Sequence, residues 1–213
     1  MNWYIKAKKK PDWSKASRYL SEVDPVLRKI IRKVGRCNIV PRSDYYALLC
    51  ISIFNQQISM KVADILYNRF RDLFPRRKPN PQRLLDMLRE NCDCLNGCGL
   101  SRQKKAYIID LSEKFAAKKI PTHRFAKMAD EEIIESLTQV KGIGQWSAEM
   151  FLMFVLNRPD VFPVDDLGLR EAVKRAYKLK ERPGAKELRA MGERWRPWRT
   201  VATWYLWRGL EAE

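Results

Sequence analysis

Apolar residues recur at intervals of three and four along most of this chain, which is the spacing of one face of a helix. The clearest stretch follows Asp24 and Pro25, an N-cap residue and a proline suited to the first helical turn, and it ends at Gly35. Its apolar positions are Leu27, Ile30, Ile31 and Val34. This pattern predicts an amphipathic helix over residues 25–34.

The segment 45–54 is apolar on most faces and predicts a central, buried helix. Alternation of apolar and polar residues, the signal of a half-buried strand, is absent over any useful length. Further helices are expected at 60–74, 82–90, 101–117, 130–140 with Asp130 as its cap, 146–156, 167–177, 185–195 and 198–210, with a basic loop at 75–81. Nine or ten short helices without a sheet predict an all-α fold.

Length and composition are those of a folded globular protein. The chain has 213 residues and a mass of 25.2 kDa, which suits one large domain or two small lobes. Apolar residues make up 46% and charged residues 31%, so disorder is excluded for the bulk of the chain.

The charge balance points to a polyanionic partner. Lysine and arginine total 42 against 25 acidic residues, which gives a formal net charge of +17 and a sequence pI near 9.8. A field of that strength concentrates phosphates around the protein. Nucleic acid and an anionic membrane surface are the two candidate partners.

Neither a membrane-spanning segment nor a standard secretion signal is expected. No apolar run approaches the roughly 20 residues that a transmembrane helix needs. The segment 1–11 is basic and has no apolar core behind it. The five cysteines are odd in number and stand in a chain large enough to fold without disulfides, which favours a reducing, intracellular compartment. A DNA partner would place the protein in the cytoplasm or nucleoid of a prokaryote, or in the nucleus of a eukaryote.

A glycine hairpin at 142–144 is the strongest local motif. Gly142, Ile143 and Gly144 separate the end of one predicted helix from Gln145 and Trp146 at the start of the next. Two glycines at this spacing permit a tight turn whose backbone N–H groups meet a phosphate at a helix N-terminus. On these residues alone, the simpler interpretation is a connector between two helices.

Two adjacent carboxylates, Asp165 and Asp166, stand 19 and 20 residues beyond Trp146, at the end of an extended loop and the start of a predicted helix. The commonest role of aspartate at such a place is a helix N-cap. A carboxylate held in a cleft is also suited to general-base work or to stabilising a cationic transition state. Both roles are open for this pair.

Four motifs occur in order between residue 45 and the C-terminus: Asn-Gln-Gln-Ile-Ser at 55–59, the hairpin at 140–146, Pro-Val-Asp-Asp at 163–166, and the tryptophan-rich segment 195–207. Together they resemble the helix-hairpin-helix superfamily of DNA base-excision glycosylases, and within it the 3-methyladenine DNA glycosylase II branch. The resemblance implies a single glycosylase unit of two lobes, with the active site in the groove between them. One lobe is expected at about 45–130 and the other at about 1–44 plus 131–213.

The resemblance also implies residue roles. Asp166, with Asp165 as the alternative, would stabilise the oxocarbenium-like sugar and orient the attacking water. Trp146, Met150 and Trp207 would line an aromatic pocket whose electron-rich faces attract cationic alkylated purines; for Trp207 and Met150, core packing is the simpler interpretation. The hairpin (Gly142, Ile143, Gly144, Gln145) would contact DNA. Gln57, supported by Asn55 and Gln56, would fill the space of the extruded nucleotide. For this Asn-Gln-Gln run, a capped turn between two helices is the simpler interpretation.

The chain departs from parts of the family pattern. Relatives with lyase activity carry a lysine two residues after the second hairpin glycine, where this chain has Trp146, so a monofunctional enzyme that uses water is implied. No cysteine follows Cys98, so the iron–sulfur cluster of some relatives is not expected. Cys92, Cys94 and Cys98 lack a convincing fourth ligand for zinc. No cofactor is expected to be required, and a monovalent cation at the hairpin is left open.

The expected function is removal of alkylated purines of the 3-methyladenine and 7-methylguanine type from double-stranded DNA by a monomeric enzyme. Within the class, the alternative is a glycosylase for deaminated or oxidised bases such as hypoxanthine, uracil or 8-oxoguanine. Outside it, a non-catalytic DNA-binding protein would use the same hairpin and charge. A structural or RNA-associated basic protein would leave the paired aspartates unexplained.

Overall fold

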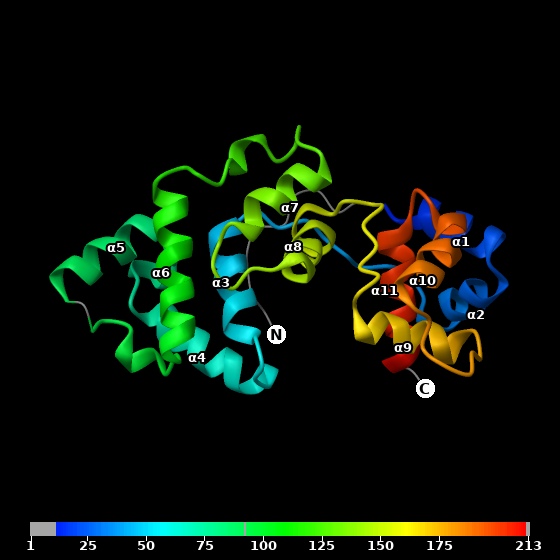
Figure 1. The fold of residues 1–213 in the computed structure, drawn as a ribbon, viewed down its shortest axis with the longest axis horizontal. Helices are drawn as coiled ribbons and strands as arrows, with labels where there is room; N and C mark the ends of the chain where they lie inside the picture. Colours follow the sequence, from blue (N-terminus) through cyan, green and yellow to red (C-terminus); the bar gives the residue numbers. More distant parts are fainter. Residues whose placement is uncertain (1–11, 92, 212–213) are drawn as a thin grey trace. The chain divides into compact units, whose positions relative to one another are not determined.

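The structure, a computed structural model, describes residues 12–91 and 93–211 and consists of helices and turns, with no strand in these ranges. The prediction of an all-α fold is confirmed. The described chain divides into two compact units (Figure 1). We call residues 44–148 the hairpin unit and residues 12–43 with 149–211 the aspartate unit.

The hairpin unit is built around α3 and α6. Its elements are α3 (Tyr45–Asn55), α4 (Met60–Asp72), η1 (Pro75–Arg77), α5 (Pro81–Glu90), η2 (Asn96–Cys98), α6 (Arg102–Ala116), η3 (Thr122–Arg124), α7 (Asp130–Thr138) and the start of α8 (Gln145–Phe151). Helix α6 packs against α5 and α3, and α3 packs against α4. The prediction of a central helix at 45–54 is confirmed, because α3 buries Tyr46, Ala47, Leu48, Leu49, Cys50, Ile53 and Phe54.

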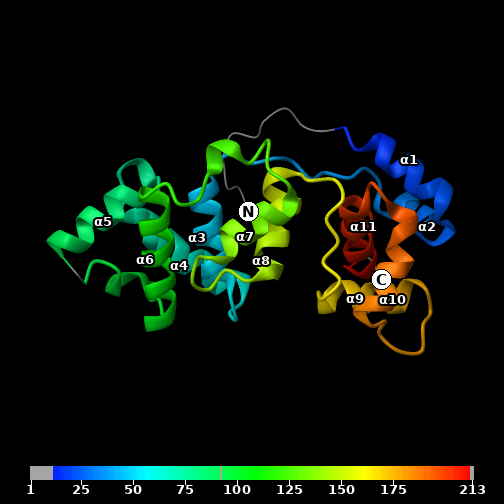
Figure 2. The same ribbon diagram turned by 45° about the horizontal axis from the view of Figure 1, so that its top comes forward.

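The aspartate unit surrounds α11. Its elements are α1 (Ser14–Val23), α2 (Pro25–Val34), the end of α8 with the π-helical turn η4 (Leu152–Leu156), α9 (Leu167–Ala176), α10 (Ala185–Gly192), η5 (Glu193–Trp195) and α11 (Arg199–Glu211). Helix α11 packs against α9, α2 and α1, as Figures 1 and 2 show. Seven consecutive residues of α11, from Thr200 to Leu206, are buried, so this helix forms the centre of the core.

Asp24 links three parts of the aspartate unit. Its carboxylate accepts hydrogen bonds from the N–H groups of Val26 and Leu27, which confirms its predicted role as the N-cap of α2. It also accepts from the Tyr177 hydroxyl at 2.6 Å and the Trp195 indole N–H at 2.9 Å. Asp24 is fully buried. Four donors therefore compensate the loss of water around a buried carboxylate.

Three features differ from the sequence analysis. Helix α1 was not expected, because only Ala16 and Leu20 form its buried stripe. The cap of α7 is Ala129, whose N–H donates to the Glu132 carboxylate at 2.7 Å, and the expectation that Asp130 caps this helix is wrong. The boundary between the units falls at 148/149, so 131–148 belong with 44–130 and not with the other lobe.

No helix in the described ranges combines the length and the apolar character needed to cross a membrane. The basic segment 1–11 lies outside the described residues.

Candidate functional site

The hairpin forms the predicted tight turn between α7 and α8. Gly142 has a φ of +82°, in the region that favours glycine, and the N–H of Ile143 donates to the carbonyl of Val140 at 3.0 Å. The Ile143 side chain is buried, whereas Gly144 and Gln145 are exposed. The apolar residue thus anchors the turn in its own unit and leaves the following backbone on the surface.

The two hairpin glycines have different physical roles. A Cβ on Gly142 would overlap the ring of Tyr107 in α6, so only glycine fits the close approach of this ring. A Cβ on Gly144 would meet nothing within 4 Å. Gly142 is therefore required by packing and by backbone conformation, while Gly144 keeps an exposed stretch of backbone bare of side chain, as a phosphate contact requires.

A buried carboxylate on α6 accepts a hydrogen bond from the backbone just before the hairpin glycines. Asp110 is 8% exposed, and its Oδ2 accepts from the Lys141 N–H at 2.9 Å while its Oδ1 accepts from Lys114 Nζ at 2.6 Å. Burial alone would raise the pKa of Asp110, but these hydrogen bonds and charges outweigh it and the pKa is lowered. Asp110 was not among the predicted site residues, although an acid on the buried face of a predicted helix was a usable signal.

The Asn-Gln-Gln segment lies beside the hairpin. Asn55 ends α3, Gln56 is its C-cap, and Gln57 is exposed with a φ of +55°. The Gln56 side chain donates from Nε2 to the carbonyl of Gly142 at 2.7 Å. Two motifs that are 86 residues apart in sequence are therefore joined directly. Ser59, the last residue of the motif, caps α4 by accepting from the Val62 N–H at 3.4 Å.

Asp166 lies at the start of α9. It is the N-cap of α9, and its Oδ1 accepts from the Leu169 N–H at 2.5 Å. The same oxygen accepts from the indole N–H of Trp207 at 3.1 Å. Asp166 is partly buried. Two donors on one oxygen fix the carboxylate plane, which is the preorganisation an electrostatic catalyst needs.

Asp165 has a different environment. Its side chain is 71% exposed and accepts from Arg170 Nη2 at 2.9 Å. An exposed carboxylate paired with a guanidinium has its charge screened by solvent and partner alike. Between the two predicted carboxylates, the geometry therefore favours Asp166.

Trp207 contacts Asp166 through its edge and an aromatic neighbour through its ring. Its ring centroid lies 6.0 Å from that of Phe154 at an interplanar angle of 30°, and the residue is partly buried. Gly168 lies close to both side chains, because a Cβ at this position would be 3.1 Å from Asp166 Oδ1 and 3.5 Å from Trp207 Nε1. Trp207 therefore constrains the orientation of the Asp166 carboxylate, while its predicted role as a pocket wall stays a prediction.

The loop that leads to Asp166 is tied to the start of α11. Thr200, fully buried, accepts from the Val161 N–H at 3.0 Å and donates to the Arg158 carbonyl at 2.6 Å. Arg199 contacts Asp160 through Nε at 2.7 Å and Nη2 at 2.9 Å. Helix α11 therefore anchors both ends of the loop, at Thr200 and at Trp207. Sequence reasoning missed Thr200, Arg199 and Asp160, since nothing local marks them.

The other two predicted pocket residues lie in different units. Trp146 belongs to the hairpin unit and is 51% exposed, which is unusual for a tryptophan. Met150 lies one turn further along α8, in the aspartate unit, and is partly buried.

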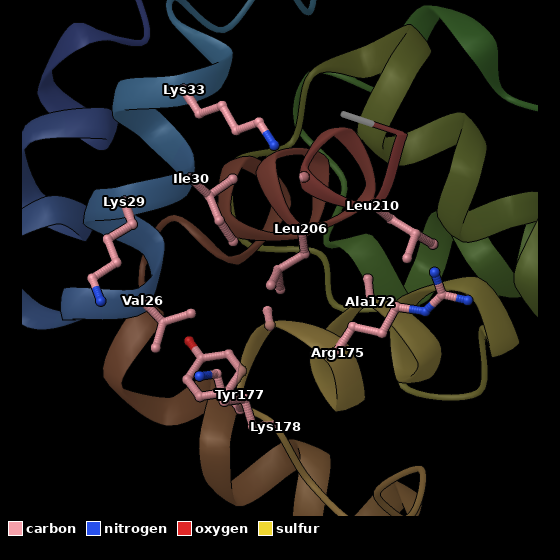
Figure 3. Close-up of a pocket in the computed structure, with 12 residues that line it drawn as sticks. Val26, Lys29, Ile30, Lys33, Ala172, Arg175, Tyr177, Lys178, Leu206 and Leu210 are labelled. Carbon is pink, nitrogen blue, oxygen red and sulfur yellow. The ribbon is translucent and has the colours of Figure 1, made fainter. Parts of the chain in front are cut away.

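A cavity of about 430 Å³ opens between α2, α9 and α11 in the aspartate unit (Figure 3). Its floor is apolar, with Val26, Ile30 and Leu206 among its residues. Figure 3 shows Lys29 and Lys33 on the α2 side and Arg175 and Lys178 on the α9 side. None of the predicted site residues lines this cavity, so it is separate from the site described above.

Across the described residues, no group of three or more histidine, cysteine or acidic side chains is arranged to hold a metal ion. Cys98 is buried, which raises the pKa of its thiol to about 11, and Cys94 is partly buried. Cys92 lies outside the described residues. A thiol whose pKa is raised by burial is a poor metal ligand at neutral pH.

Comparison with known proteins gives consistent findings. A family model described as "HhH-GPD superfamily base excision DNA repair protein" matches residues 50–197. The chain is 30% identical over 209 residues to the alkylbase DNA glycosidase-like protein mag2 of Schizosaccharomyces pombe, covering 94% of this chain and 95% of that protein.

Two solved structures are similar over most of the chain. One is the S. pombe 3-methyladenine DNA glycosylase Mag1 in complex with abasic DNA, with 34% identity, a TM-score of 0.78 and coverage of 92% of this chain and 96% of that one. The other is a DNA-3-methyladenine glycosidase from Bacillus halodurans, with 32% identity, a TM-score of 0.81 and coverage of 94% and 90%.

Proposed function

This chain belongs to the HhH-GPD superfamily of base excision DNA repair proteins, and on that basis we propose that it is a DNA glycosylase that removes alkylated purines from duplex DNA. The relatives named as 3-methyladenine glycosylases support this substrate class. The reaction breaks the bond between the base and C1′ of the sugar and leaves an abasic site.

The observation that carries the proposal is the held carboxylate of Asp166. As the base departs, positive charge develops on the sugar, and a fixed negative charge nearby lowers the energy of that state. An N3- or N7-methylated purine is already cationic and leaves as a neutral base. Water then forms the new bond to C1′ and releases a proton, and the Asp166 carboxylate orients that water. No acid catalyst is needed for such a leaving group.

DNA binding is assigned to the hairpin unit. The backbone at Gly144 and the start of α8 are suited to binding a phosphate. Gln57 is exposed and has a positive φ, and we assign it to the space that the extruded nucleotide leaves in the base stack of the duplex. The net charge of +17 supplies long-range attraction to the DNA backbone. The enzyme is proposed to act as a monomer, inside the cell where its DNA substrate lies.

The proposed reaction is hydrolytic and needs no cofactor. Trp146 occupies the position of the nucleophilic lysine of lyase-competent relatives, so no covalent enzyme–sugar intermediate and no strand cleavage are expected. The hairpin carbonyl of Val140 accepts one hydrogen bond, from Ile143, and has a second lone pair that a monovalent cation could use. No step of the proposed reaction depends on such a cation.

The test is chromatography of the bases released from methylated duplex DNA by the wild type, Asp166→Asn and Asp165→Asn. Asparagine is as good an N-cap as aspartate, so Asp166→Asn removes the charge and spares the fold. We expect release of 3-methyladenine or 7-methylguanine by the wild type and by Asp165→Asn, and loss of release with Asp166→Asn.

Other outcomes would redirect the assignment. Equal release by the wild type and Asp166→Asn would exclude Asp166 as the catalytic carboxylate. Release of hypoxanthine, uracil or 8-oxoguanine in place of methylated purines would assign the alternative substrate class. Duplex binding without release of any base would indicate a binding protein. Strand cleavage at the abasic site would contradict the hydrolytic mechanism.

A further inference from the structure

Lys104, in the first turn of α6, is directed at two backbone carbonyls. Its Nζ donates to the carbonyl of Phe54 at 2.8 Å and to that of Gln56 at 2.7 Å. Both carbonyls stand at the C-terminal end of α3, where the helix leaves its last carbonyls without partners. A cation at that end is also favoured by the helix dipole.

Gln56 connects the residue that Lys104 holds to the hairpin. Its backbone carbonyl accepts from Lys104, and its side-chain Nε2 donates to the carbonyl of Gly142 at 2.7 Å. A chain of hydrogen bonds therefore runs from α6 through the Asn55–Gln57 segment to the hairpin turn. Gln57, the exposed residue of this segment, follows directly after the bridge.

One face of α6 supports both motifs. Lys104, Tyr107 and Asp110 are spaced three residues apart and so lie on the same side of the helix. Tyr107 packs under Gly142 and Asp110 binds the Lys141 N–H. Lys104 adds the contact that brings the Asn55–Gln57 segment to the same support. Partial burial lowers the pKa of the Lys104 ammonium.

The neighbouring Lys105 is a natural comparison. Its Nζ contacts the side-chain oxygen of Asn96, in the turn η2, and touches neither the hairpin nor the Asn55–Gln57 segment. The two lysines are adjacent on one helix and carry the same charge. They differ in that only Lys104 is bonded to the end of α3.

We propose that Lys104 is a positioning residue that, through Gln56, locks the Asn55–Gln57 segment to the hairpin so that both meet DNA as one rigid element. The proposal rests on the proposed function, in which Gln57 fills the space left by the extruded nucleotide. Lys104 acts through carbonyls and makes no phosphate contact. Its charge is therefore used inside the protein, unlike that of a typical lysine in a DNA-binding domain.

The salt dependence of DNA binding separates these two uses of a lysine. Each phosphate that a cation neutralises contributes about 0.9 to the slope of log affinity against log salt. Lys104→Met should leave the slope for undamaged duplex unchanged, yet reduce single-turnover base release at saturating enzyme about tenfold, equivalent to the loss of one charge-assisted hydrogen bond. Lys105→Met should leave base release unchanged. Gln56→Met, which breaks the bridge without removing a charge, should reproduce the release defect.

Hydrogen exchange of the free protein tests the lock without reference to activity. The amide of Ile143, which is hydrogen-bonded to the Val140 carbonyl, should exchange at least about tenfold faster in Lys104→Met and Gln56→Met, and at the wild-type rate in Lys105→Met. Unchanged exchange in Lys104→Met, or a salt slope reduced by about one, would overturn the proposal. If the wild type releases no base while the exchange result holds, the proposed function fails and the lock stands.

Discussion

The indole nitrogen of Trp207 lies 3.1 Å from Oδ1 of Asp166, although the two residues are 41 positions apart in the sequence. This contact joins the last helix of the chain to the cap of α9. It sets the direction in which the carboxylate presents its charge. The indole N–H also withdraws some of that charge, so the Trp207 contact affects orientation and electrostatics together.

Trp207→Phe tests this contact directly. Phenylalanine keeps an aromatic ring against Phe154 and removes only the N–H donor. We expect base release to fall about tenfold, because a hydrogen bond to a charged group contributes about 1.5–3 kcal/mol and part of that is expressed in the transition state. Trp204→Phe, a buried tryptophan of the same helix, serves as the control for packing loss. An equal fall in both variants would show that packing alone matters.

Gly168→Ala separates stability from activity. Alanine is the better helix former by about 1 kcal/mol, so the thermal midpoint should not fall. The added Cβ would lie 3.1 Å from Asp166 Oδ1, close enough to displace the carboxylate by a few tenths of an ångström. We expect unchanged or raised stability with reduced base release, measured by calorimetry and by a single-turnover assay. Gly184→Ala, where a Cβ meets nothing within 4 Å, should leave release unchanged.

The hairpin glycines should give opposite phenotypes. Gly142→Ala forces a Cβ into the Tyr107 ring at a position with φ of +82°, so it should destabilise the protein by more than about 1 kcal/mol in urea unfolding. Gly144→Ala places a Cβ on bare, exposed backbone, so it should spare stability and weaken binding to undamaged duplex. If Gly144→Ala binds duplex as tightly as the wild type, the assignment of this turn to phosphate would be wrong.

Asp110→Asn should destabilise the protein in a pH-dependent way. The folded-state pKa of Asp110 is lowered, so its charged form contributes stability that is complete above the unfolded pKa of about 3.9 and is lost as pH falls through the lower folded value. The difference in unfolding free energy from the wild type should be about 1–3 kcal/mol at neutral pH and shrink below about pH 4. Urea titrations at several pH values measure it.

Asp86, a partly exposed residue paired with the exposed Arg89 on α5, supplies the control. Asp86→Asn should change the unfolding free energy by less than about 1 kcal/mol, because exposed pairs contribute little. A difference for Asp110→Asn that persists undiminished at low pH would mean that the carboxylate contributes through packing and not through its charge.

Most helices follow from local pattern. Helices α2, α3 and α9 begin where a capping aspartate precedes an apolar stripe, at Asp24, Asp44 and Asp166, and each of these side chains caps its helix. Helix α1 was not predicted from the sequence, because its buried stripe is short and its stability comes from packing on α2 and α11. The prediction that Asp130 caps α7 was wrong because aspartate, a preferred capping residue, is also favourable in the first turn of a helix, where its negative charge interacts with the helix dipole.

The motifs with chemical meaning were local as well. The glycine hairpin, the Asn-Gln-Gln segment and the aspartate pair are each contiguous, and their residue types carry their own chemistry. The residues that hold these motifs in place are not local. Asp110 and Lys104 on α6, and Thr200 on α11, form hydrogen bonds to them from 31 to 50 residues away in the sequence. Hydrogen bonds of such range depend on how helices pack, which no sequence window contains.

Residue order alone thus specified most of the helices and the positive charge, because propensity, capping and net charge depend on residue types and their neighbours in the chain. Folding gave Asp165 and Asp166 different environments, since only the packing of α11 brings the Trp207 N–H to Asp166, whereas Arg170 pairs with Asp165. Folding also distinguished the two hairpin glycines, because a positive φ and the close approach of the Tyr107 ring require glycine at 142, whereas a Cβ at 144 would meet nothing within 4 Å.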